Sequence, residues 1–88
     1  MSFMSAEDIK FELIGYVEKS PSEVTNIQMM RKTQLIGLHH SFGAYIRNTY
    51  KLWDKDNPLT QNYEQYPLKH PDEVSYNLIV GVWEHFNK

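Results

Sequence analysis

The spacing of hydrophobic residues is helical nearly throughout the chain. Ser5 followed by Asp8 is typical of an N-cap with an acidic first turn, and it predicts a helix over residues 6–19. The expected buried stripe of this helix consists of Ile9, Leu13, Tyr16 and Val17. A strand through KFELIGYV is the competing interpretation, because Gly15 weakens a helix by about 1 kcal/mol relative to alanine.

A second start signal lies in the sequence SPSE at 20–23, which supplies a capping serine, a proline at the first helical position and a glutamate. It predicts a helix over residues 21–32. The longest helix is expected over residues 34–53 and is predicted to be the central one, with an apolar side and a polar side. The apolar side carries Leu35, Leu38, His39, Phe42, Gly43, Ile46, Thr49, Tyr50 and Trp53. The polar side carries His40, Ala44, Arg47, Asn48 and Lys51.

Turn-forming residues end this helix at the sequence DKDNP, where Asn57 and Pro58 are expected to cap a short helical piece. A proline followed by two acidic residues at 71–73 then opens a final helix that runs to about residue 86. The predicted fold class is all-α. We expect a compact bundle of three main helices plus one or two short helices, in a single domain over residues 1–88.

The final helix is apolar on nearly all sides. Its main stripe consists of Val74, Leu78, Val82 and Phe86. A second stripe on nearly the opposite side consists of Tyr76, Val80 and Trp83. A helix that is hydrophobic all round is usually buried, yet so short a chain has little interior. We therefore expect the second stripe either to bind another chain, since tryptophan and tyrosine are common at interface hot spots, or to be covered by other helices of this one.

Composition narrows the possible functions. The 88 residues fit one domain and leave no room for a catalytic lobe beside a cofactor domain. The absence of cysteine excludes a disulfide framework, a thiolate zinc site and a cysteine nucleophile. A net charge of -2 gives no reason to expect general binding to nucleic acid. No apolar run approaches the roughly 20 residues that span a bilayer, and the start lacks an apolar signal core, so a cytoplasmic location is expected.

Two separated segments resemble a small bacterial or phage domain family of unknown function. They are LHHSFGAYIRN at 38–48 and HPDEVS at 70–75, where the family reads approximately LHFGLGMWIRN and HPDDMS. The resemblance covers about residues 35–88 and departs from the pattern at Ser41, Tyr45 and Glu73. It implies a shared helical fold and no particular activity.

The polar residues of these segments suggest two kinds of site. Arg47 is expected to pair with Asp72 or Glu73 across the loop, with Asn48 satisfying a carbonyl in the same corner, as a structural tie. Alternatively His40, Arg47 and Lys51 form a basic helix face that binds an anion or other ligand. His39 and His40 point about 100° apart on a helix, and the chain has no HExxH spacing, so neither a metal nor another cofactor is expected.

The function expected from these patterns is non-enzymatic. Ser41 has no glycine elbow, and no spacing brings a nucleophile and a base together. A protein of this size and mild acidity is expected to act by protein–protein interaction, as an inhibitor, an immunity or antitoxin-like protein, or an adaptor. The expected partner is another protein or a second copy in a homodimer. The alternative is a nucleotide- or nucleic-acid-binding module that uses the basic helix face.

Overall fold

The computed structural model describes residues 3–88, and the described chain contains helices and turns but no strand, which confirms the all-α class. The four α-helices are α1 (Ala6–Glu18), α2 (Pro21–Met29), α3 (Ala44–Thr49) and α4 (Pro71–Phe86). Three short segments of other helical type are η1 (Lys32–Leu38) and η3 (Pro67–Lys69), which are 3-10, and η2 (His39–Gly43), which is π-helical. The first and last helices begin where the sequence predicts, and the strand interpretation of the first is wrong.

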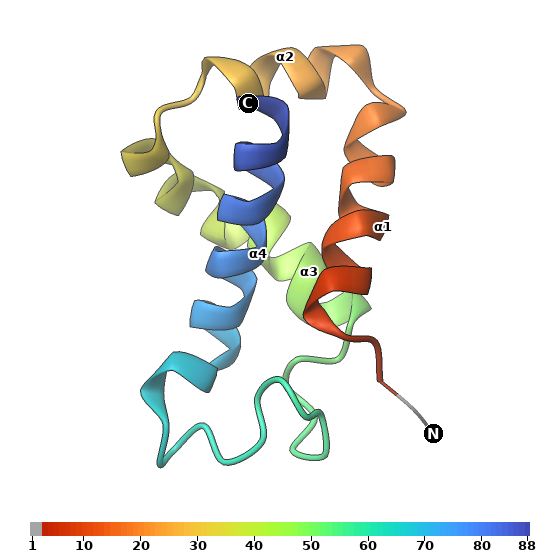
Figure 1. Ribbon diagram of the computed structural model, residues 1–88. Helices are drawn as coiled ribbons and strands as arrows, with labels where there is room; N and C mark the ends of the chain where they lie inside the picture. The colour runs from red at the N-terminus through yellow and green to blue at the C-terminus, as the bar shows by residue number, and fades with distance from the viewer. Residues whose placement is uncertain (1–2) are drawn as a thin grey trace.

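The last helix, α4, is the centre of the molecule, because every other helical segment contacts it. Figure 1 shows that α1 lies beside α4 and that α2 crosses near the C-terminal end of α4. The core clusters around this helix; its apolar side chains include Leu78, Ile79 and Val82 of α4 and Ile9 and Leu13 of α1. A helix surrounded in this way needs apolar residues on several faces, which explains the pattern of α4.

The buried face of α1 differs from the predicted stripe at one position. Ile14 is buried and Tyr16 is half exposed. Tyr16 points to the edge of the helix, where its ring stacks on rings from η2 and α3 instead of entering the core. The prediction of Tyr16 as a core residue is therefore wrong.

The predicted central helix over residues 34–53 is also wrong, both in its continuity and in its central position. The segment passes from 3-10 to π to α geometry and ends at Thr49. A 3-10 turn is tighter and a π turn is wider than an α turn, so their effects on the direction of the side chains compensate. The spacing of apolar residues over the whole segment therefore resembles that of one continuous α-helix. Leu35 and Ile46, at the two ends, both reach the core.

Side chains of the loop terminate α3 and replace the predicted short helix near residue 57. Lys51 adopts a left-handed backbone conformation with φ 55°. The buried amide of Asn57 donates to the carbonyls of Tyr50 and Lys51 at 3.1 and 3.2 Å, which satisfies the end of the helix. The Thr60 hydroxyl donates to the Leu52 carbonyl at 2.8 Å. Because these polar groups bind carbonyls of the three residues that follow α3, residues 57–63 form turns and no helix.

Candidate functional site

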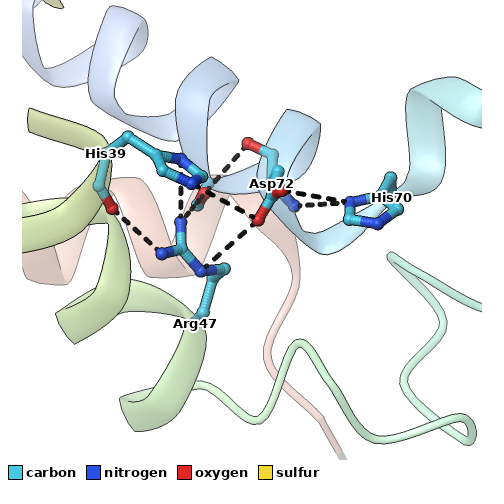
Figure 2. A network of polar contacts seen from close by, with 5 residues as sticks. His39, Arg47, His70 and Asp72 are labelled. Carbon is cyan, nitrogen blue, oxygen red and sulfur yellow. Dashed lines mark hydrogen bonds and ion pairs between the residues drawn. The ribbon is translucent and has the colours of Figure 1, made fainter. Parts of the chain in front are cut away.

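The two sequence segments that carry the family resemblance meet in one polar corner, around a buried arginine. Arg47 extends from α3 toward the start of α4 (Figure 2), and its side chain is buried, with the residue only 6% exposed. Its Nη2 donates to the His39 carbonyl at 2.9 Å, and its Nη1 donates to the Ser75 hydroxyl at 3.0 Å. Its Nε lies 3.6 Å from Oδ1 of Asp72. One guanidinium therefore joins η2, α3 and α4.

The start of α4 organises the other side of this corner. Nδ1 of His70 accepts from the Asp72 amide at 3.1 Å and so caps the helix. The Ser75 hydroxyl, which accepts from Arg47, donates to the Asp72 carbonyl at 3.0 Å. We call the five residues His39, Arg47, His70, Asp72 and Ser75 the polar corner.

A glycine makes room for the arginine. A Cβ atom on Gly43 would lie 2.9 Å from Nη1 of Arg47 and 3.4 Å from the Leu38 carbonyl oxygen. Gly43 is one helical turn before Arg47, so the guanidinium folds back over the position that a larger residue would fill. The spacing of Gly43 and Arg47 in the resembling segment thus has a packing reason.

The imidazole and hydroxyl groups of the polar corner also contact neighbouring groups. Nδ1 of His39 lies 3.4 Å from Nη1 of Arg47. Nε2 of His39 lies 3.9 Å from Oδ1 of Asp72. Ser75 gives its hydrogen to a backbone carbonyl. These contacts link side chains of η2, α3 and α4 in one place.

Of the other residues predicted for the tie and the anion site, His40 contacts the polar corner, because its ring meets the His39 ring edge-on with centroids 4.9 Å apart. Asn48 and Glu73 lie exposed, with no hydrogen bond or ion pair to Arg47. The placement of Arg47 on an exposed polar face with His40 and Lys51 is wrong, since Arg47 is buried while the other two are exposed. His40 instead lines a shallow hollow of about 410 Å³ with His39, Asp72, Glu73 and Tyr76.

The predicted partner-binding stripe of α4 lies half-buried inside the molecule. Tyr76, Val80 and Trp83 pack against the core. The indole Nε1 of Trp83 donates to the Met30 carbonyl at 2.8 Å, at the end of α2. Gln28 of α2 likewise donates to the Phe86 carbonyl at 3.0 Å. The chain's own α2 therefore covers the Trp83 end of this stripe.

A second group of side chains lies open on the surface, and sequence analysis did not find it. The rings of Tyr16 and Tyr45 stack with centroids 4.8 Å apart, and each lies 6.4 Å from the Phe42 ring. Phe11, five residues before Tyr16 on α1, is 80% exposed and lines one hollow together with Tyr16 and Tyr45, and Tyr16 itself is 50% exposed. We call Phe11, Tyr16, Phe42 and Tyr45 the aromatic face.

The available signal for this face was the position of Phe11 outside the apolar stripe of the first helix. A large apolar residue off the buried stripe predicts an exposed hydrophobic group. The stacking of Tyr16 on Tyr45 could not be found in this way, because the two residues come from segments that meet only in the folded chain.

A tyrosine at the edge of the face holds α1 to the end of α3. The Tyr50 hydroxyl donates to Oε1 of Glu12 at 2.7 Å. Burial raises the pKa of Tyr50, and the hydrogen bond to the Glu12 carboxylate raises it further. The phenol therefore stays protonated and keeps the two helices joined over the neutral pH range.

Among residues 3–88 no group of three or more histidine, aspartate or glutamate side chains could hold a metal ion. None of the helices in this part of the chain is long and apolar enough to cross a membrane.

Comparison with known proteins gives one finding. No curated protein and no solved structure matches the chain. The sequence profile of a family described as a domain of unknown function (DUF6794) matches residues 17–86. The match includes both segments of the polar corner and begins earlier than the expected resemblance over residues 35–88, so that it also covers α2. Because the profile spans most of the sequence, the chain belongs to this family of domains of unknown function.

Proposed function

We propose that this protein is a non-enzymatic binding module that docks its aromatic face onto another protein. The observation that carries the proposal is the cluster of three stacked rings of Tyr16, Phe42 and Tyr45, with the 80% exposed Phe11 lining the same hollow as Tyr16 and Tyr45. Exposed aromatic clusters on small domains mark interaction sites, and tyrosine is enriched at interface hot spots. The mechanism is occlusion, in which the face covers a surface that the partner needs.

Protein–protein interaction is the class of function expected from the sequence. The proposed binding surface, however, is the aromatic face and not the second stripe of α4. The stripe of Tyr76, Val80 and Trp83 is a poor docking surface, because Trp83 already binds the Met30 carbonyl. The roles that suit a small occluding protein are inhibitor, immunity or antitoxin-like protein, and adaptor. A cytoplasmic setting in a bacterium or phage belongs to the same proposal.

The alternative of nucleotide or nucleic-acid binding has less support from the geometry. It requires the Arg47 guanidinium to meet a phosphate, and that group is buried and bound to His39, Ser75 and Asp72. His40 and Lys51 alone would supply a weak phosphate contact.

The test is affinity capture from nuclease-treated lysate of the source organism, with two matched variants. Phe11→Ala removes an exposed ring of the aromatic face, and Leu68→Ala removes a side chain of similar exposure from η3. We expect Phe11→Ala to lower partner recovery about tenfold and Leu68→Ala to leave it unchanged. Both should keep the unfolding free energy within about 0.5 kcal/mol of the parent chain.

Two outcomes of this experiment contradict the proposal. Equal recovery of every captured protein by the parent chain and by Phe11→Ala would mean that the aromatic face binds nothing. Recovery that requires nucleic acid, and that disappears on nuclease treatment, would favour the basic helix face.

A further inference from the structure

A groove runs along one side of the aromatic face, between α1, α2 and η2. It has a volume of about 510 Å³, which is within the range of sites that accept a large apolar group. Tyr16, Phe42 and Tyr45 line one part of it, and Leu38 and Val17 contribute aliphatic surface. The groove can therefore hold an apolar side chain from a partner.

A second hollow lies on the other side of the Tyr16 ring. It has a volume of about 640 Å³ and is lined by Phe11, Tyr50 and Met4 together with polar residues of α1. Tyr16, Tyr45 and Lys19 belong to both hollows. The two hollows thus form one continuous surface with an aromatic ridge, suited to a segment that presents several apolar side chains in a row.

The charged residues around this surface are mostly acidic. Asp8 and Glu12 line the second hollow and Glu23 lines the first, whereas Lys19 is the single basic residue at either. None of the three acids forms an ion pair with a lysine or arginine within residues 3–88. The surface therefore offers three carboxylates for opposite charges on a partner.

This charge pattern argues against two other occupants. In a two-fold dimer the same patch meets itself, so the carboxylates of both copies would face one another without compensation. A nucleic-acid backbone would bring phosphates toward the same acids. Both arrangements place like charges together at the rim of an apolar contact.

The mode of binding follows from the fold. The described chain has no strand and hence no sheet edge that could pair with an extended peptide. A surface made of helices with an apolar groove is the type that receives an amphipathic helix, whose apolar side chains recur on one face.

We propose that the aromatic face receives a basic amphipathic helix of a partner protein. Apolar side chains of that helix enter the two hollows beside Tyr16, and its lysine or arginine residues reach Asp8, Glu12 and Glu23. This inference rests on the proposed function and specifies the chemistry of the partner. Arginine or lysine next to exposed Tyr16 and Tyr45 also gains from contact with the tyrosine rings.

The experiment measures binding of a labelled helical peptide by fluorescence anisotropy. The probe is a peptide of about 18 residues with leucine on one face of the helix and lysine on the opposite face. Its counterpart carries glutamate in place of lysine. We expect the leucine–lysine peptide to bind the full chain, with an affinity that falls as salt is added. The leucine–glutamate peptide should not bind.

Two sets of variants locate the binding. The triple variant Asp8→Asn, Glu12→Gln and Glu23→Gln should lower the affinity for the leucine–lysine peptide about tenfold, since each rim charge contributes modestly. As the matched control, Asp56→Asn, Glu64→Gln and Glu84→Gln removes three exposed acids outside both hollows, and it should change the affinity by no more than about twofold. Tyr16→Ala should abolish binding while the helical circular dichroism signal is retained.

Several outcomes overturn the inference, and they differ from failure of the proposed function. If the two triple variants weaken peptide binding equally, the peptide is attracted to the acidic protein in general and not to this surface. If the leucine–lysine peptide does not bind at all, the proposal of a basic helix as partner is refuted. A dimer in sedimentation that Phe11→Ala dissociates would assign the face to a second copy. A natural partner that depends on Phe11 but not on the three acids would leave the proposed function standing and refute only this inference.

Discussion

In the polar corner, ionisable and hydroxyl groups bind one another and the backbone, whereas in the aromatic face large rings lie open to solvent. Arg47 has partners in η2 and α4, and the part of the chain that the structure describes has no buried side-chain polar atom without a hydrogen bond. Phe11 and Tyr16 have large exposed areas that nothing within residues 3–88 covers. The comparison teaches that residue types associated with chemistry can be structural, while common aromatic residues form the available surface.

The largest effect is expected in the polar corner, from Arg47→Ala. The substitution removes hydrogen bonds to the His39 carbonyl and to Ser75 and leaves a gap beside α4. We expect the free energy of unfolding to fall by about 3 kcal/mol, measured by urea denaturation at neutral pH.

Two further variants distinguish the guanidinium from its charge. Arg47→Lys should recover little of the loss, because a single ammonium cannot reach both sides of the corner. Asp72→Asn should cost less than Arg47→Ala, since the Asp72 side chain is 43% exposed and water replaces part of its interaction. A loss below about 1 kcal/mol in Arg47→Ala would show that the corner does not hold the fold together.

The next effect tests the close packing of the corner through Gly43→Ala. The added methyl group would lie 2.9 Å from Nη1 of Arg47, so the guanidinium must shift away from its hydrogen-bond partners. We expect a loss of about 1–2 kcal/mol in unfolding free energy.

The matched control for this prediction is Gly15→Ala on α1, where a Cβ atom meets nothing within 4 Å. That change should stabilise the protein by up to about 1 kcal/mol through helix propensity. In the Arg47→Ala background the cost of Gly43→Ala should largely disappear, and an unchanged cost would rule out the guanidinium as its cause.

The smallest effect belongs to the edge of the aromatic face, where Tyr50 binds Glu12. Tyr50→Phe removes this hydrogen bond and should cost about 0.5–1 kcal/mol at neutral pH, because both groups are partly solvated. Unfolding free energies of the two proteins from pH 7 to pH 11 provide the measurement.

The difference in unfolding free energy between the parent chain and Tyr50→Phe is expected to depend on pH. The pKa of Tyr50 is higher in the folded chain than its usual value of about 10, so its contribution is complete below that pH and declines as pH rises toward the folded pKa. The difference between the parent chain and Tyr50→Phe should therefore shrink above pH 10. Tyr66→Phe, at an exposed position, serves as the control, and a constant difference for Tyr50→Phe would contradict the assignment.

Much of the fold was predictable from local signals. Ser5 caps α1 through its hydroxyl, which accepts from the Asp8 amide at 3.2 Å, and Pro21 and Pro71 stand at the starts of α2 and α4. These signals act within one turn of helix, so sequence reasoning finds them. The change from 3-10 to π to α geometry between Lys32 and Thr49 was not predictable, because apolar spacing cannot distinguish such a segment from one helix.

The candidate sites were predictable to a smaller degree. The two segments around Arg47 and Asp72 suggested a contact, and the structure places Nε and Oδ1 3.6 Å apart. The inclusion of His39 and Ser75 depends on where η2 lies against α4, which is a long-range contact. The exchange of Tyr16 for Ile14 in the core of α1 has the same origin, since neighbouring helices decide which edge of an apolar stripe is covered.

The sequence by itself determined the helical class and the ends of the first and last helices, because caps, prolines and apolar spacing act locally. Only the tertiary structure decided that α4 is the central helix, that Arg47 is buried and that the aromatic face is open. Burial depends on which helices pack together, and that packing is set by the whole chain.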